Sequence, residues 1–201
     1  MILQKDELTT DISKMLILGS GSSARKELLN SIGIVPDRVE TPDVDESPRV
    51  NEHPRHYVNR IAIEKANSIV SDKQSYLITA DTVVTAGKRL LMKTSDKERV
   101  EEYLKLLSGR RHSVYTAFCV KHSGLINFKL VRTVLKMRLL TEKEIISYIE
   151  CGEWIGCAGG YSIQGRAKCF FPFINGCYSN VVGLPLPSLI GVLNALGFYK
   201  K

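Results

Sequence analysis

The chain has 201 residues, of which 44% are hydrophobic and 24% are charged, values typical of an ordinary soluble globular protein. Its 28 Lys and Arg against 21 Asp and Glu give a net charge of +7, which favours anionic partners through long-range attraction. No apolar stretch approaches the ~18 residues that span a bilayer, so we expect no membrane partner. The five cysteines include no CxxC pair, and their spacing fits no common zinc pattern. We therefore expect free thiols and a cytoplasmic protein.

The N-terminal half alternates short strands and helices. The first 14 residues are mostly polar and predict an extension, followed by a single domain over residues 15–201. Apolar periodicity and turn residues indicate the elements that follow. In chain order we expect a strand over 15–18, a Gly/Ser turn over 19–23, a helix over 24–31, a loop over 40–54, a helix over 54–70 and a strand over 76–84.

The remaining elements predict the fold class. A hairpin over 82–93 turns at Ala86-Gly87, and Ser95 with Glu98 forms a capping box for a helix ending at Leu107. Further on we expect strands over 113–122 and 125–139, a helix over 141–150, an irregular glycine-rich segment to residue 183, and a helix over 186–196. Strands and helices follow one another in mixed order along the chain, and long hairpins occur among them. This pattern predicts an α/β fold with a mixed, partly antiparallel sheet and flanking helices.

The segment GSGSSARKELL, residues 19–29, is a candidate anion site. A strand, a Gly/Ser loop and a helix N-terminus would present backbone N–H groups and a positive dipole end. Ser20 and Ser22 add hydroxyl groups, and Arg25 adds a guanidinium suited to phosphate. The segment is neither a Walker A loop nor GxGxxG. A capped turn with a surface arginine is the alternative interpretation.

Lys65 lies within an apolar stripe. On the helix that begins at Pro54, successive apolar residues recur at helical spacing, and Lys65 projects between Ile61 and Ile69. A lysine on an inner face snorkels, pairs with a buried acid, or lines a cavity that holds an anion. The sequence leaves structural pairing or snorkelling on the one hand, and an anion site on the other, open.

Asp81 interrupts the most strand-like segment, YLITADTVV. An unpaired buried carboxylate costs several kcal/mol, so we expect Asp81 to be compensated by a turn, an ion pair or a metal. Asp45 and Glu46 lie in a loop, and Lys93 closes the hairpin. Carboxylates of this kind hold Mg²⁺ or Mn²⁺, while lysines neutralise a polyphosphate.

The order of these motifs resembles the Maf family of nucleotide pyrophosphatases. The resemblance covers about residues 15–197, and its fragments are GSGSSARKELL, VDESP, EKA, ITADTVV, Lys93, LSGRRHSVYTA, CAGGYSIQG and NVVGLPL. It implies an inosine-triphosphate-pyrophosphatase-like α/β fold with a cleft between two lobes. It also implies metal-dependent hydrolysis of a nucleoside triphosphate to the monophosphate and pyrophosphate.

The resemblance also assigns roles to individual residues. By this resemblance, the phosphates are bound by Ser20, Ser22, Arg25, Lys65 and Lys93. Glu46 and Asp81 hold a divalent cation, Mg²⁺ or Mn²⁺, and Asp81 accepts the proton of the attacking water.

The substrate implied by the resemblance is dTTP or UTP. The pairing of ADT, which contains Thr82, with IQG, which contains Gln164, resembles the subgroup that acts on these nucleotides. This subgroup usually has Arg where the chain has Ala24, and Pro where it has Thr94. We therefore expect a pyrimidine preference that is shallower than in the subgroup, with modified nucleotides as further candidate substrates.

Two other functions remain as alternatives. The first is a non-catalytic nucleotide-binding regulator, because members of the family have been linked to septum formation and cell division. A nucleic-acid partner, suggested by the net charge, is disfavoured because no aromatic stacking stripe is apparent. The oligomeric state is open, with a homodimer as one alternative.

Overall fold

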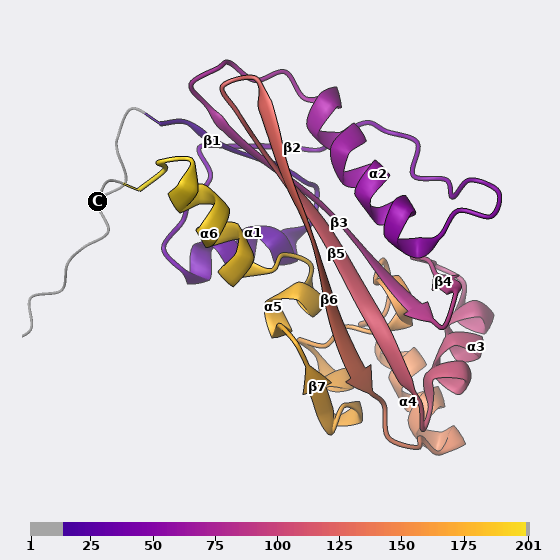
Figure 1. The fold of residues 1–201 in the computed structure, drawn as a ribbon. Coiled ribbons are helices and arrows are strands. Elements are labelled where there is room, and N and C mark those ends of the chain that lie inside the picture. Colours follow the sequence, from indigo (N-terminus) through magenta and orange to yellow (C-terminus); the bar gives the residue numbers. More distant parts are fainter. Residues whose placement is uncertain (1–13, 200–201) are drawn as a thin grey trace, which may run out of the picture.

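A single mixed sheet forms the centre of the molecule (Figure 1). The computed structural model describes residues 14–199, so the expected polar extension over 1–14 lies outside the description except for Lys14. Within that part of the chain the sheet has seven strands. They are β1 (Leu16–Gly19), β2 (Arg38–Glu40), β3 (Tyr76–Ala86), β4 (Arg89–Leu91), β5 (Arg111–His122), β6 (Leu125–Lys136) and β7 (Phe173–Asn175).

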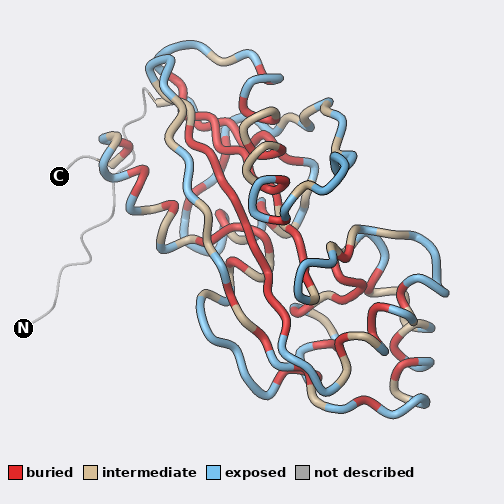
Figure 2. The backbone as a smooth tube through the Cα atoms, turned by 45° about the vertical axis from the view of Figure 1, so that its right-hand side comes forward, coloured by how far each residue is buried: buried red, intermediate tan, exposed pale blue. Residues whose placement is uncertain are grey.

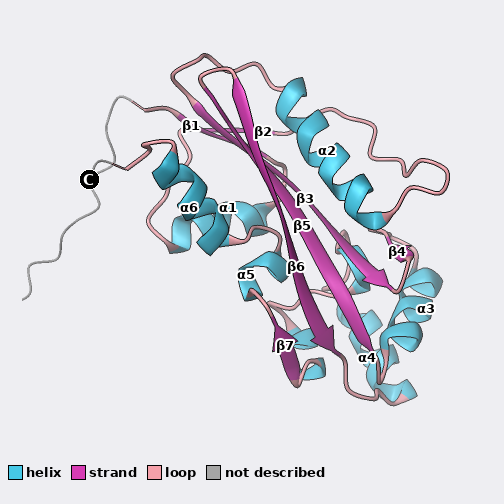
Figure 3. Cartoon of the chain, in the orientation of Figure 1, coloured by secondary structure: helices cyan, strands magenta, loops and turns pink. Residues whose placement is uncertain are grey.

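The strand order is β2-β1-β3-β5-β6-β7, with β4 paired to β3. The strands β2, β1 and β3 are parallel, whereas β3, β5, β6 and β7 run antiparallel to their neighbours. The long β5–β6 hairpin crosses the molecule diagonally in Figure 3 and turns at Ser123 and Gly124, both with positive φ. The predicted mixed, partly antiparallel sheet is confirmed.

Helices cover both faces of this sheet. Their bounds are α1 (Ser23–Ser31), α2 (Pro54–Ser68), α3 (Lys97–Leu107), α4 (Glu142–Cys151), α5 (Tyr178–Val182) and α6 (Leu186–Ala195), with 3₁₀ turns at Ala158–Gly160 and Arg166–Phe170. None of the helices within residues 14–199 is long and apolar enough to cross a membrane.

Alternation along β5 separates the two faces, because successive strand residues point to opposite sides. Tyr115, Ala117 and Cys119 pack with α2. Phe118 and Val114, on the other face, belong to two different hydrophobic clusters. Figure 2 shows that the long central strands are buried for most of their length.

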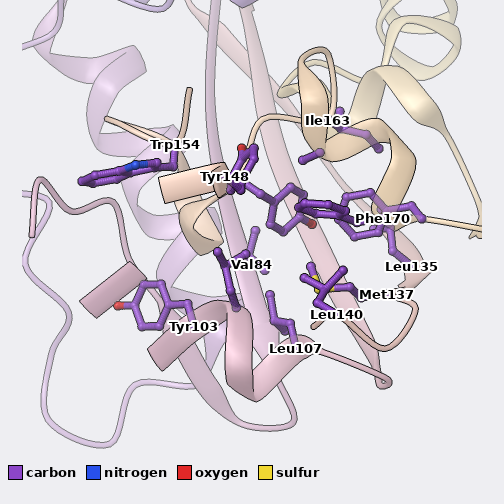
Figure 4. Close-up of a cluster of buried hydrophobic side chains, with 14 of the residues drawn as sticks. Val84, Tyr103, Leu107, Leu135, Met137, Leu140, Tyr148, Trp154, Ile163 and Phe170 are labelled. Carbon is purple, nitrogen blue, oxygen red and sulfur yellow. The ribbon is translucent and has the colours of Figure 1, made fainter. Parts of the chain in front are cut away.

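The two clusters on that second face occupy opposite ends of the sheet. One, the α3–α4 cluster, is drawn in Figure 4 and includes Val84, Leu107, Tyr148 and Trp154. The other, the α1–α6 cluster, includes Leu29 of α1 and Leu189 of α6 with apolar residues of β1, β3 and β5. Burial of each large side chain stabilises the fold by ~1.5–3 kcal/mol. The chain therefore has two lobes on a shared sheet, as expected.

Several local predictions need correction. Asp96, not Ser95, caps α3, because its carboxylate accepts hydrogen bonds from the Glu98 and Arg99 amides. The capping box predicted at Ser95 is therefore wrong. β2 was not predicted, and the segment expected to be irregular contains two 3₁₀ turns, β7 and α5. These pieces are only three to five residues long, too short to produce a recognisable periodicity.

Candidate functional site

The candidate site lies at a gap along one edge of β3. On that side β1 pairs with β3 only as far as Thr79, and β4 begins to pair at Val84. On the other side β5 pairs with β3 throughout this stretch. Asp81 therefore sits where the edge of the strand is open within the described sheet. A side chain in this gap is reachable from the space between the two lobes, which explains a carboxylate within a strand.

Asp81 is held by a lysine from α2. Lys65 Nζ lies 2.9 Å from Asp81 Oδ1 and 2.7 Å from Glu46 Oε1. Asp81 is 3% exposed and Lys65 is 5% exposed, so their ion pair is buried. Lys65 is thus an inward lysine that pairs with acids and also lines a cavity.

Glu46 approaches from the loop before α2. The Tyr57 hydroxyl donates to the Glu46 carbonyl at 2.8 Å and so anchors this loop to α2. Burial raises the pKa of Glu46, but the hydrogen bond and charge of Lys65, with the charges of Lys93 and Arg25, outweigh it and lower the pKa overall. Glu46 is therefore ionised at neutral pH. Its neighbour Asp45 is exposed and accepts from the Ser47 amide.

The Gly/Ser loop and α1 form one wall. Ser20 Oγ accepts from the Ser22 amide at 3.2 Å and from Arg25 Nη1 at 3.0 Å. Ser22 precedes the first turn of α1, and its side chain does not cap the helix. Backbone N–H groups of that turn are therefore not capped by the Ser22 side chain, and an anion could bind there.

Arg25 is buried and joins this wall to two distant segments. Its Nε donates to the Gly183 carbonyl at 2.8 Å, and Nη2 donates to Thr82 Oγ1 at 3.1 Å. With Ser20, these bonds use three of the five N–H groups of the guanidinium, and two remain. Burial lowers the pKa of Arg25, although the charges of Asp81 and Glu46 act in the opposite direction. An arginine stays charged in either case.

A cavity of about 560 Å³ lies between the lobes. Eight of the predicted site residues line it: Ser20, Ser22, Arg25, Glu46, Lys65, Thr82, Lys93 and Gln164. Asp81 lines a second cavity of about 220 Å³, which shares Glu46, Thr82 and Lys93 with the first. Residues predicted from six separate motifs therefore meet at one place.

The segment after α4 closes the cavity from the other lobe. Gly159 has φ +75°, and a Cβ there would lie 2.8 Å from Val84 of β3, so only glycine fits this approach. Cys157 and Tyr161 line the cavity. Burial raises the pKa of the Cys157 thiol, and the opposing charge of Lys93 does not cancel this effect. Exposed Gln164 completes this wall.

Sequence reasoning missed two residues that organise the site. Tyr57 belongs by its spacing to the apolar stripe of α2, which hides its role, although a buried tyrosine hydroxyl usually needs a partner. Thr116 lies opposite Thr82 in the β3–β5 register and bonds to it, and no local sequence signal distinguishes it from other strand threonines.

Comparison with known proteins gives the family. The family model described as Maf-like protein matches residues 15–196. A dTTP/UTP pyrophosphatase from Roseobacter denitrificans is 46% identical over 92% of this chain and 98% of the relative. A nucleoside triphosphate pyrophosphatase from Anaplasma phagocytophilum is 42% identical over 92% of this chain and 96% of the relative. A solved HAM1 protein from Coxiella burnetii aligns with 92% of this chain and all of its own at 13% identity and a TM-score of 0.49. Because the family model matches nearly the whole chain, the chain belongs to the family of Maf-like proteins.

Proposed function

We propose that this protein is a nucleoside triphosphate pyrophosphatase that hydrolyses dTTP and UTP to the monophosphate and pyrophosphate. The observation that carries the proposal is the Glu46–Lys65–Asp81 cluster beside a cavity lined with basic and hydroxyl side chains. The names of relatives that are 40–46% identical support the same activity.

The reaction needs one water and one proton acceptor. The water oxygen forms a bond to phosphorus, and the anhydride bond between the α- and β-phosphates breaks. The pyrophosphate leaves with the electron pair of that bond, and the proton from water passes to the Asp81 carboxylate. General-base catalysis of this kind is worth ~10²–10⁴-fold in rate. Lys65 orients Asp81 through the 2.9 Å ion pair.

The positive groups around the cavity hold the triphosphate. Ser20, Ser22 and the amides of the first turn of α1 face the anion from one wall. Lys93, which is exposed, and the two remaining N–H groups of Arg25 supply charge. Lys65 lies between the carboxylates and the phosphates. Charged hydrogen bonds of this type are about twice as strong as neutral ones.

The residues present fit a divalent cation. Glu46 and Asp81 already direct oxygen atoms at one positive group, and oxygen ligands suit Mg²⁺ and Mn²⁺. No group of three or more metal-ligating side chains occurs among residues 14–199, so water and phosphate oxygens would complete the coordination. When bound, such a cation would neutralise phosphate charge and acidify a water molecule.

In this proposal, Thr82 and Gln164 recognise the base. Both line the larger cavity, Thr82 from β3 and Gln164 from the opposite lobe. A site that bonds to polar groups of its substrate rejects analogues that lack them. The missing arginine at Ala24 makes the preference shallower, and modified pyrimidine nucleotides remain candidate substrates.

We also place the protein in the cytoplasm. All five cysteines are free, which is the usual state in a reducing compartment. Nucleoside triphosphate pools are found there, and a pyrophosphatase would limit them or remove unwanted members.

A product assay tests the function. The purified protein should convert UTP and dTTP to the monophosphate and pyrophosphate with Mg²⁺ or Mn²⁺, and EDTA should abolish turnover. Asp81→Asn serves as the inactive control. Formation of UDP and phosphate, or turnover that survives both EDTA and Asp81→Asn, would contradict the proposal.

A further inference from the structure

Thr116 is a buried polar residue at the boundary between the two hydrophobic clusters. On β3, Ala80 belongs to the α1–α6 cluster and Val84 to the α3–α4 cluster, with Thr82 between them. Thr116 pairs directly with Thr82 in the antiparallel register and is 0% exposed. A buried hydroxyl at such a position must be hydrogen-bonded, so its partners can be counted.

The partners of Thr116 fix the direction of its own proton. Thr116 Oγ1 lies 2.8 Å from the Asn180 carbonyl oxygen, which can only accept. The Thr116 proton therefore points to Asn180. The contact of 3.0 Å between the two threonine hydroxyls then needs a proton from Thr82. A hydroxyl has only one proton, so the proton of Thr82 is committed to Thr116.

Arg25 takes one of the two lone pairs of Thr82. Its Nη2 donates to Thr82 Oγ1 at 3.1 Å. The other acceptor near Thr82, the Gly183 carbonyl, is 3.4 Å away and already receives Arg25 Nε at 2.8 Å. Thr82 is left with a single free lone pair and no proton to donate.

We infer that Thr116 is a positioning residue that makes Thr82 a pure acceptor and so selects uracil and thymine over cytosine. This inference rests on the proposed function, in which Thr82 faces the base. Uracil and thymine carry a hydrogen on N3 and can donate it to Thr82. Cytosine has a bare N3 that would meet the lone pair of Thr82 and be repelled. The amide of Gln164 offers both a donor and an acceptor, so it does not discriminate in this way.

Substitution of Thr116 tests the direction of the hydroxyl. Thr116→Val keeps the shape but removes the acceptor, so the Thr82 proton becomes available to cytosine N3. We expect kcat/KM for CTP to rise and the UTP to CTP ratio of kcat/KM to fall by about five- to tenfold, the worth of one hydrogen bond. A gain with CTP cannot come from general structural damage. Thr116→Ser retains the hydroxyl and should restore the wild-type ratio.

Two further variants complete the design. Thr133→Val removes another fully buried strand threonine, one that bonds to the Asn180 side chain and to Cys177 but not to Thr82. It should lower the melting temperature and leave the UTP to CTP ratio unchanged. Thr82→Val removes the acceptor itself and should lower kcat/KM for UTP towards the CTP value.

The outcomes separate this inference from the proposed function. Turnover of UTP with an unchanged ratio in Thr116→Val would overturn the role of Thr116 and leave the function standing. A change in ratio for Thr133→Val as large as that for Thr116→Val would also overturn it. A wild-type protein that hydrolyses neither UTP nor dTTP would overturn both.

Discussion

Lys65 and Asp81 form a buried ion pair, 2.9 Å from Nζ to Oδ1, that joins α2 to β3. The same ammonium contacts Glu46 at 2.7 Å, so one positive charge serves two carboxylates. The cluster carries a net negative charge, and Arg25 and Lys93 lie close enough for their charges to lower the pKa of Glu46. Asp81 is thus compensated by the protein itself through the ion pair with Lys65.

Asp81→Asn should separate catalysis from stability. We expect turnover to fall by ~10²–10⁴-fold, because an amide cannot accept the proton of water. Lys65 retains Glu46 at 2.7 Å and the amide oxygen, so the free energy of unfolding should change by less than ~2 kcal/mol. Steady-state kinetics and urea unfolding measure the two quantities. The control is Asp43→Asn, an exposed acid of the same loop as Glu46, which should behave as wild type. Activity of Asp81→Asn within a few-fold of wild type would refute the role.

His112 should make stability depend on pH. The ring is buried with Nε2 at 2.8 Å from the Tyr161 hydroxyl, and burial lowers the pKa of His112 to about 4. An unfolded histidine titrates near 6.5, so between pH 6.5 and 4 the unfolded chain binds the additional proton. The free energy of unfolding should therefore fall on acidification through this window, by up to about 3 kcal/mol.

The measurement is urea unfolding at several pH values between 7 and 4. His112→Gln retains a partner for Tyr161 but does not titrate, so its stability should fall less over the same window. His56→Gln, which changes an exposed histidine of α2, should keep the wild-type slope. Parallel pH profiles for wild type and His112→Gln would show that His112 does not cause the dependence.

The sequence was informative where periodicity was strong. The helical spacing of α2 placed Lys65 on the buried side, and the burial of its neighbours Ile61 and Ala66 confirms the pattern. The β-branched residues and the Ser123-Gly124 turn also predicted the long β5–β6 hairpin. Long elements of this kind average over many side chains, so one unusual residue does not obscure them.

The features that the sequence did not predict depend mostly on contacts between distant segments. Arg25 bonds to Gly183, which is 158 positions away, and neither local sequence indicates the other. The role of Thr116 follows only from its register with Thr82. At α3, Ser95 and Asp96 are both good capping residues, and only the backbone geometry decides between them.

Ala24→Arg should sharpen the pyrimidine preference. Ala24 lines the cavity beside Arg25, whose guanidinium is already held by Ser20, Thr82 and Gly183. A second arginine would be free to bond to the nucleotide, with a charged hydrogen bond worth about 1.5–3 kcal/mol. We expect the ratio of kcat/KM for dTTP over dGTP to rise by about 10–100-fold. Asn30→Arg adds the same charge on the exposed side of α1 and should leave the ratio unchanged. Equal gains for both nucleotides would indicate a phosphate contact instead.

Lys65→Gln should bind Mn²⁺ more tightly than wild type although it is less active. The Lys65 ammonium contacts Glu46 Oε1 at 2.7 Å and Asp81 Oδ1 at 2.9 Å, the two carboxylates that would hold a divalent cation in the proposed function. In the wild type we expect cation binding to repel the ammonium and to displace at least one of these charged hydrogen bonds, each worth about 1.5–3 kcal/mol.

Removal of the ammonium eliminates this competition and leaves two carboxylates with no ion-pair partner of their own. Calorimetry without nucleotide should therefore give a Kd for Mn²⁺ at least about tenfold lower in Lys65→Gln than in wild type. Lys93→Gln is the matched control, because it removes the same charge from the cavity without an ion pair to either carboxylate among the described residues. Its effect on Mn²⁺ should be smaller, since only a longer-range repulsion is lost. Weaker Mn²⁺ binding in Lys65→Gln than in wild type would mean that the lysine supports the metal site and does not compete with the metal for its oxygen ligands.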